Sequence, residues 1–284
     1  MDEIPSWRKV RIIKRIYKDR LPNDVRSAFW KYCLQLEEKE CLKEYEEYSN
    51  KLLPQEESTQ IDKDVNRTIR YHQFYKDRYG EGQCKLFRVL KAYANYNSET
   101  RYTQGMSTIA GILLIYIPEE HLAFGALKEL FSRYKLNNWY ANGLDGLQKE
   151  VFPTLEKLIS KYLPKLHHHL YKILAQGMAL EHYCGLFITN WFLELFFDSL
   201  PWPLMLKVWD TFLWFGNPAL YSIALALLEA LEAHLLSLND FSALVKELKN
   251  TGDFKGDQKK LLKRAFKFAI DEKQLEKIKA KVTH

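Results

Sequence analysis

The sequence predicts an all-α fold. Apolar side chains recur every three or four residues along most of the chain, whereas the alternation typical of strands is almost absent. Glycine and proline are sparse, at 12 and 9 of 284 residues, while aromatic residues are abundant, with 7 Trp, 17 Tyr and 16 Phe. This composition disfavours both disorder and an all-β architecture with many tight turns. A chain of this length can also bury a substantial core.

The first half contains three clear helical patterns and one turn. Apolar residues at helical spacing predict helices over residues 36–53, 86–93 and 106–113. In the first of these, Leu42 and Leu52 belong to the apolar face, and Pro54 follows as a stop. The polar segment 95–100 is rich in residues that hydrogen-bond to their own backbone, which predicts a turn.

The second half of the chain has the same helical spacing of apolar residues. Helices are expected over residues 155–163, 169–175, 187–195, 204–215 and 220–238. Asn-Gly and Asp-Gly dipeptides interrupt the pattern between residues 142 and 150. We therefore expect one domain over residues 1–284, made of two helical subdomains that meet near residues 148 and 149.

The charge distribution argues against a nucleic-acid partner. The net charge is +6, because 42 basic residues are opposed by 36 acidic ones spread along the chain, and the pI is about 8.9. The basic excess lies mainly between residues 246 and 281. A solvated helix face is the ordinary interpretation of such a run, and attraction to an acidic partner or an anionic membrane surface is the alternative.

The cysteines and the apolar segments indicate a cytoplasmic protein. The four cysteines form no CxxC pair, and residues 1–19 are charged and lack the apolar core of a signal peptide. The most apolar stretch, residues 185–216, is interrupted by acidic residues, a lysine and two prolines, which a lipid-facing span would not tolerate. We expect this stretch to form core helices.

Two short segments carry the most distinctive chemistry. Asp64 precedes Arg67 by three residues, a spacing that places a carboxylate beside the guanidinium on a helical turn. The polar residues 58–60 predict that a loop enters a helix here. Taken alone, the pair could be an ordinary surface ion pair.

The second segment places a glutamine at a predicted helix start. Gln104 follows the polar turn and precedes an apolar helix, with Thr103 as a candidate N-cap. A helix start favours groups that face phosphate or an anionic transition state. The alternative is a cap without a partner, in which Gly105 only permits close packing. An arginine that neutralises charge and a glutamine that orients water are the side chains that GTP hydrolysis needs.

Four short motifs occur in order along the chain. Arg26 to Trp30 reads RxxxW, Ile61 to Arg67 reads IxxDxxR and Tyr102 to Gln104 reads YxQ. Trp209 and Asp210 follow a proline-rich turn in the second half. In order and spacing these motifs resemble the TBC domain, the family of GTPase-activating proteins for Rab GTPases, and the resemblance covers roughly residues 21–238.

The resemblance implies an all-helical, V-shaped fold and a dual-finger mechanism. In this mechanism Arg67 is the arginine finger, and Gln104 replaces the water-positioning glutamine of the GTPase. Asp64 would orient Arg67, and Tyr102 would support the Gln104 loop. The other matched residues are expected to be structural: Arg26, Trp30, Ile61, Gly105, Trp209 and Asp210.

The implied partner is a Rab-family GTPase in its GTP-bound form. The chain has no Walker A or GxGxxG motif, so we expect GTP and Mg²⁺ to be carried by the partner and no cofactor to be bound here. The chain would then be an activator acting in trans rather than an enzyme by itself, and a regulator of vesicle trafficking. We expect a cytoplasmic monomer that can be recruited to the cytosolic face of endomembranes by peripheral association.

One departure from the family pattern lies beside the glutamine finger. Arg101 occupies a position at which the family usually has glycine. The arginine makes a glycine-only backbone conformation unexpected there. Its side chain could contact an acidic GTPase surface or the nucleotide, or could point to solvent.

Other functions are weaker alternatives. His167, His168 and His169 lie near Glu181 and His182, but adjacent histidines point in different directions and no tetrahedral spacing emerges, so no metal site is expected. A non-catalytic Rab-binding scaffold on the same fold is the main alternative, and the presence of both fingers favours catalysis over it. A helical adapter unrelated to GTPases would require four ordered matches to be accidental.

Overall fold

The computed structural model describes residues 21–141, 143–175, 182–254, 256–268 and 270–282. Within these ranges the regular elements are all helical and no strand occurs, so the prediction of an all-α fold is confirmed. The charged segment 1–19, in which no signal peptide is expected, lies outside the described residues.

The described chain divides into two compact units: residues 22–144 form one, and Leu21 with the described residues from 145 onward forms the other. This division lies slightly before the boundary predicted near residue 148, within the stretch where glycine-containing dipeptides interrupt the helical pattern. The assignment of the whole chain to a single V-shaped domain stays a prediction.

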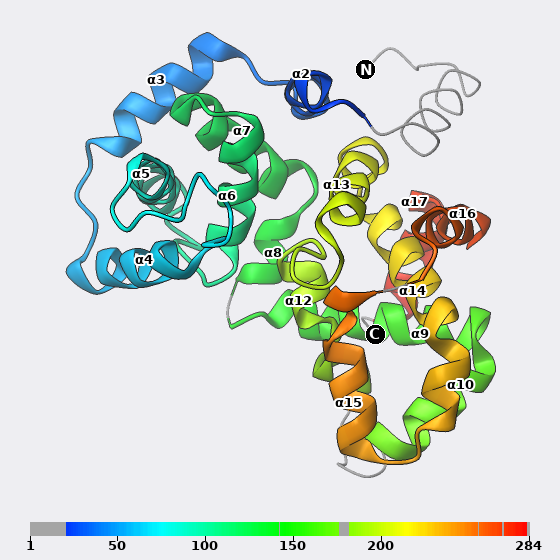
Figure 1. The fold of residues 1–284 in the computed structure, drawn as a ribbon. Coiled ribbons are helices and arrows are strands. Elements are labelled where there is room, and N and C mark those ends of the chain that lie inside the picture. The colour runs from blue at the N-terminus through cyan, green and yellow to red at the C-terminus, as the bar shows by residue number, and fades with distance from the viewer. Residues whose placement is uncertain (1–20, 142, 176–181, 255, 269, 283–284) are drawn as a thin grey trace. The chain divides into compact units, whose positions relative to one another are not determined.

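The unit of residues 22–144 contains seven helices in its described part. They are α2 (Asn23–Leu34), α3 (Glu38–Ser49), α4 (Gln55–Arg67), α5 (Glu81–Tyr96), α6 (Met106–Tyr116), α7 (Glu120–Arg133) and α8 (Leu136–Tyr140). Helix α5 is central, because it packs against α3, α4, α6 and α7 (Figure 1). Its apolar residues Leu86, Val89, Leu90 and Tyr93 are buried, as the helical spacing predicts.

The first predicted helix is shorter than the periodicity suggested. Helix α3 ends at Ser49, and Pro54 is the N-cap of α4 rather than the residue that ends α3. Leu42 and Leu52 were expected on an apolar face, but they are 43% and 91% exposed, whereas Cys41 is buried. Helix α3 therefore buries a narrower stripe than its sequence pattern indicates.

The second unit has a single long helix at its centre. Its described elements are η1 (Leu147–Val151), α9 (Phe152–Tyr162), α10 (Pro164–Leu170), η2 (Tyr171–Ala175), η3 (Tyr183–Leu186), α12 (Ile188–Leu193), α13 (Trp202–Phe215), α14 (Asn217–Ser237), α15 (Phe241–Lys249), η4 (Thr251–Asp253), α16 (Gln258–Phe268) and α17 (Glu272–Val282). Helix α14 packs against α9, α10, α13, α16 and α17.

Helix α14 is also the one described helix that is long and apolar enough to cross a membrane. Its most apolar window has a mean hydropathy of 1.5, and 61% of that window is buried inside the protein. Because five helices cover it, its apolar composition is that of a core helix.

Candidate functional site

Arg67 is the last residue of α4, and its guanidinium is held by a buried carboxylate. Nε of Arg67 donates to Oδ1 of Asp64 at 3.0 Å, and Nη2 forms an ion pair with the same oxygen at 2.7 Å. The Arg67 side chain is 61% exposed, whereas the Asp64 side chain is 2% exposed. The arginine is thus fixed along one edge, and its Nη1 makes no hydrogen bond to any residue that the structure describes. The geometry leaves this nitrogen available to an anionic ligand.

The second oxygen of Asp64 binds the segment that carries Gln104. Oδ2 accepts hydrogen bonds from the Tyr102 hydroxyl at 2.7 Å and from Nε2 of Gln60 at 3.1 Å. Burial, and then the hydrogen bond to Asp64, raise the pKa of the Tyr102 phenol well above its usual value, so the phenol remains a donor. One buried carboxylate therefore links the end of α4 to the loop before α6.

Gln104 lies directly before the residue that caps α6. Gly105 is the N-cap, with φ of 100° and ψ of −30°, a left-handed conformation that favours glycine. The prediction of Thr103 as the N-cap is wrong, since the turn is closed by the backbone hydrogen bond from Met106 N to Thr103 O at 3.1 Å. Gln104 is exposed, and its side-chain amide makes no hydrogen bond to the described part of the chain. Both predicted fingers are therefore presented at the surface of the same unit.

Arg101 forms an ion pair within its own chain. The sequence had suggested instead that its side chain contacts the GTPase or nucleotide, or points to solvent. Its Nε donates to Oε2 of Glu57 at 2.8 Å, its Nη2 bonds to the same oxygen, and this pairing raises the pKa of the guanidinium. The other carboxylate oxygen, Oε1, accepts the backbone N–H of Tyr102 at 2.9 Å. Glu57 thus clamps the start of the Gln104 loop onto α4.

The backbone at Arg101 also corrects the sequence-based expectation. Arg101 has φ of 54°, the left-handed region that glycine adopts most readily. For a non-glycine residue this conformation costs about 1–2 kcal/mol. The hydrogen bond from the Tyr102 N–H to the Glu57 carboxylate offsets that cost, because a hydrogen bond to a charged group contributes about 1.5–3 kcal/mol. The exposed Arg101–Glu57 pair adds at most about 1 kcal/mol. The Glu57 carboxylate therefore stabilises a left-handed backbone at an arginine.

A buried pair of hydroxyl groups provides a further link between α4 and α6. The Thr68 hydroxyl bonds to the Asp64 carbonyl at 2.7 Å and to the Ser107 hydroxyl at 2.9 Å. Thr68 directly follows Arg67, and Ser107 lies in the first turn of α6. The backbone on both sides of the two fingers is thus held by interactions away from the surface.

The remaining motif residues are buried. Trp30 and Ile61 are fully buried, and the Trp30 ring lies 4.9 Å from that of Tyr116. Arg26 is 3% exposed, bonds to Asn23 and lies over the Tyr116 ring at 5.4 Å. These positions fit the structural role expected of them.

Trp209 and Asp210 lie in α13 of the other unit and are both fully buried. Nε1 of Trp209 donates to the Leu195 carbonyl at 3.2 Å. Burial of the indole with its N–H satisfied is typical of a tryptophan that anchors a core.

The histidine cluster has other partners. His182 lies 3.0 Å from the Glu156 carboxylate through Nδ1, and His169 lies 2.7 Å from the Leu238 carbonyl through Nε2. Glu181, the other residue considered for a metal, lies outside the described residues. Among the residues that are described, no three His, Cys, Asp or Glu side chains gather as metal ligands do.

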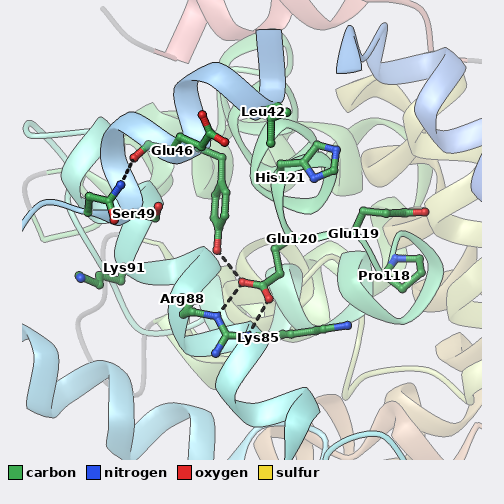
Figure 2. Close-up of a pocket in the computed structure, with 12 residues that line it drawn as sticks. Leu42, Glu46, Ser49, Lys85, Arg88, Lys91, Pro118, Glu119, Glu120 and His121 are labelled. Atoms are coloured by element: carbon green, nitrogen blue, oxygen red, sulfur yellow. Dashed lines mark hydrogen bonds and ion pairs between the residues drawn. The ribbon is translucent and has the colours of Figure 1, made fainter. Parts of the chain in front are cut away.

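A pocket of about 810 Å³ in the unit of residues 22–144 contains none of the finger residues. Figure 2 shows Arg88 and Glu120 facing one another in it, joined by hydrogen bonds at 2.8 and 2.7 Å. Glu120 also accepts the Tyr45 hydroxyl at 2.5 Å, and burial together with this bond raises the pKa of that phenol. Because the central charges of the pocket satisfy one another, we assign it a structural role.

The sequence did not reveal that Glu57 and Gln60 bind residues of the site, because the polar stretch around them was expected to precede the helix that carries Arg67. Helix α4 begins at Gln55, so residues 58–60 are helical rather than a loop that enters a helix. On a helix, Glu57, Gln60 and Asp64 are three, four and seven residues apart and share one face. A helix extended back to Pro54 would have revealed this polar stripe.

A family model described as the Rab-GTPase-TBC domain matches residues 23–236. The chain is 30% identical over 273 residues to the Rab GTPase-activating protein tbc-11 of Caenorhabditis elegans, covering 93% of this chain and 28% of that protein. It is 30% identical over 239 residues to human TBC1 domain family member 10B, covering 80% of this chain and 28% of that protein. The chain therefore spans under a third of the length of these relatives.

Two solved structures share the fold. A crystal structure of the Chlamydomonas flagellar RabGAP TBC domain superposes with a TM-score of 0.72 at 23% identity, covering 93% of this chain and 86% of the other. The Ypt/Rab-GAP domain of Gyp1p superposes with a TM-score of 0.71 at 20% identity, covering 91% and 92%. The predicted all-α TBC fold is thus confirmed, and the chain belongs to the Rab-GTPase-TBC domain family.

Proposed function

We propose that this chain accelerates GTP hydrolysis on a Rab-family GTPase by a dual-finger mechanism. Arg67 neutralises charge that develops on the transferring phosphoryl group, and Gln104 orients the attacking water in place of the glutamine of the GTPase. Asp64 and Tyr102 are positioning residues. GTP and Mg²⁺ are carried by the GTPase, so the chain acts in trans and binds no cofactor of its own.

The observation that carries this proposal is the shared anchor of the two fingers. Asp64 is buried and bonds to Arg67 through one oxygen and to Tyr102 through the other, while the Arg67 side chain and Gln104 are exposed. An ordinary surface ion pair would expose both partners and would not reach a second motif. The arrangement suits two groups that must reach an external ligand in a fixed geometry.

The proposed substrate, cellular role and location follow from the identity of the partner GTPase. Rab GTPases in their GTP-bound form are the proposed substrates, and regulation of vesicle trafficking is the proposed role. We propose a cytoplasmic monomer that works at the cytosolic face of endomembranes and has no nucleic-acid partner.

A transition-state complex tests catalysis against the scaffold alternative. The Rab protein that the chain stimulates most in a purified panel is expected to bind much more tightly with GDP and aluminium fluoride than with GDP alone, because the fluoride complex mimics the transferring phosphoryl group. Affinities can be measured by calorimetry. Equal affinity for the fluoride complex and the GTP-bound form, without stimulated hydrolysis, would identify a non-catalytic Rab-binding scaffold.

Replacement of Asp64 by asparagine is expected to reduce kcat for stimulated hydrolysis about 10- to 100-fold while Arg67 is retained. The neutral amide keeps one acceptor oxygen and places an NH₂ donor in the position of the other, so it cannot accept from Arg67 on one side and from Tyr102 and Gln60 on the other. The negative charge that holds the Arg67 guanidinium is lost as well. Single-turnover hydrolysis over a range of activator concentrations separates this kcat effect from a binding effect.

Asp62→Asn is the matched control for this experiment. Asp62 lies on the same helix, is partly exposed and makes no ion pair with a described residue. Thermal unfolding of both variants shows whether a loss of activity follows from a loss of folded protein. Unchanged kcat in folded Asp64→Asn would contradict the positioning role.

A further inference from the structure

Helix α16 presents a basic face that the proposed catalysis does not use. Its eleven residues, Gln258–Phe268, include five Lys or Arg and no acidic residue. Leu261, Leu262 and Ala265 are buried, and the helix packs along α14. At about 100° per residue, the exposed residues fall within an arc of about 120° on the opposite side. We call this set the α16 basic face: Lys259, Lys260, Lys263, Phe266 and Lys267.

The four lysines of the α16 basic face make no ion pair with any described residue. Elsewhere in the described chain, Lys51, Lys85 and Lys128 each pair with glutamates, and the unpaired lysines Lys39 and Lys43 of α3 lie among the glutamates of that helix. Helix α17 differs as well, because Glu272 and Glu276 lie among its lysines. The α16 basic face is therefore a concentration of uncompensated positive charge rather than part of a mixed surface.

Two acidic residues beside α16 already have partners. Asp257 caps the helix, since its Oδ1 accepts the backbone N–H groups of Lys259 and Lys260 at 2.8 and 3.1 Å. On α14, Glu229 lies 3.4 Å from Arg264, which flanks the face. The charge of the four lysines is thus left for an external anion.

Phe266 adds an apolar group at one edge of the α16 basic face, next to Lys263 and Lys267. Its side chain is 36% exposed, and it packs edge-on against Phe215 with ring centroids 6.4 Å apart. An aromatic ring beside long ammonium side chains matches the layers of a bilayer surface, with phosphates outside and hydrocarbon beneath.

We propose that the α16 basic face is a docking site for an anionic lipid bilayer. The lysines contact acidic headgroups while Phe266 reaches the boundary of the acyl chains. A bilayer fits better than a protein partner, because the face is a convex helix surface of one charge and offers no acceptor group that would fix a specific contact. This inference concerns a surface separate from Arg67 and Gln104 and does not depend on the proposed catalysis.

The expected contribution is large enough to measure. Each lysine near an anionic surface increases the partition coefficient about fivefold, so three lysines contribute about a hundredfold. The interaction decays within a Debye length, which falls from about 8 Å at physiological ionic strength to about 3 Å at 1 M salt. Binding should therefore be strongly salt-dependent.

Sedimentation with vesicles, without any GTPase, tests the proposal. The purified chain is expected to sediment with vesicles of equal parts phosphatidylcholine and phosphatidylserine at physiological ionic strength, and to remain in solution with phosphatidylcholine alone. The triple variant Lys260→Gln, Lys263→Gln, Lys267→Gln is expected to lose about a hundredfold in partitioning. Phe266→Ser is expected to weaken the binding that persists at high salt, because it removes the apolar contact.

The matched control is the triple variant Lys39→Gln, Lys43→Gln, Lys76→Gln. These lysines belong to the other unit, are exposed and make no ion pair with a described residue, so the control changes the net charge equally. Circular dichroism verifies that both triple variants are folded. If both triple variants lost the same amount of vesicle binding, binding would depend on net charge alone, and the proposal would be overturned. So would binding of an acidic protein at this face without binding of anionic vesicles, or equal binding to both kinds of vesicle.

Discussion

Replacement of Arg67 by alanine is expected to lower stimulated GTP hydrolysis by about 10³- to 10⁵-fold, the contribution of an arginine finger supplied in trans. This corresponds to about 4–7 kcal/mol of transition-state stabilisation, far more than a solvated ion pair contributes. The Arg67 side chain is 61% exposed, and its hydrogen bond and ion pair in the described structure are both with Asp64, so its removal should leave the fold intact. Phosphate release from the most responsive Rab protein measures the effect.

The control for Arg67 is its exposed neighbour Arg70, three residues further along the chain. Arg70→Ala removes the same charge from the same region, so it should change the binding of the GTPase at most and leave kcat near the wild-type value. Arg67→Lys should also be severely impaired, because an ammonium cannot donate to Asp64 along one edge and to a phosphoryl oxygen from the other nitrogen. Equal turnover by wild type and Arg67→Ala would reject the arginine-finger assignment.

Replacement of Gln104 by alanine is expected to reduce kcat about a hundredfold or more, because the attacking water then loses its orientation. The exposed Gln104 amide makes no hydrogen bond to the described part of the chain, so little stability should be lost. Single-turnover hydrolysis gives kcat, and thermal unfolding reports on the fold.

A second variant set determines which protein supplies the glutamine. When the catalytic glutamine of the GTPase is replaced by alanine, the wild-type chain should still stimulate hydrolysis, whereas Gln104→Ala should not. Gln73→Ala is the control in this chain, since Gln73 is also exposed and lies in the same unit. Dependence on the glutamine of the GTPase alone would reject the dual-finger version and leave a single arginine finger.

The sequence was sufficient for the fold class and the family, because both depend on patterns that are local or ordered along the chain. Helical spacing identified α5 and α6 well, since their apolar residues are buried. The same reasoning failed at Leu52, which is exposed beyond the end of α3. Periodicity reports which residues could share a face, but only tertiary contacts determine where that face ends.

The connections within the candidate site could not be predicted from the chain alone. The spacing of Asp64 and Arg67 predicted a contact on one helical turn, and the structure has it. The bonds of Tyr102 to Asp64 and of Arg101 to Glu57 join residues about 40 positions apart, where no local rule applies. The left-handed backbone of Arg101 is likewise a tertiary effect, because Glu57 offsets a local preference.

The position of Asp64 affects the entropy of the proposed encounter. Its Oδ1 holds the Arg67 guanidinium and its Oδ2 accepts from Tyr102 and Gln60, so Arg67 and the Tyr102 segment are ordered when the unit folds. Immobilising a long side chain on association commonly costs about 0.5–1.5 kcal/mol. A GTPase that meets this surface would not bear that cost for the arginine or for the loop beside Gln104. The free energy of the contacts between the two proteins can then stabilise the transition state of hydrolysis. In this way the Asp64 carboxylate preorganises the site before the GTPase binds.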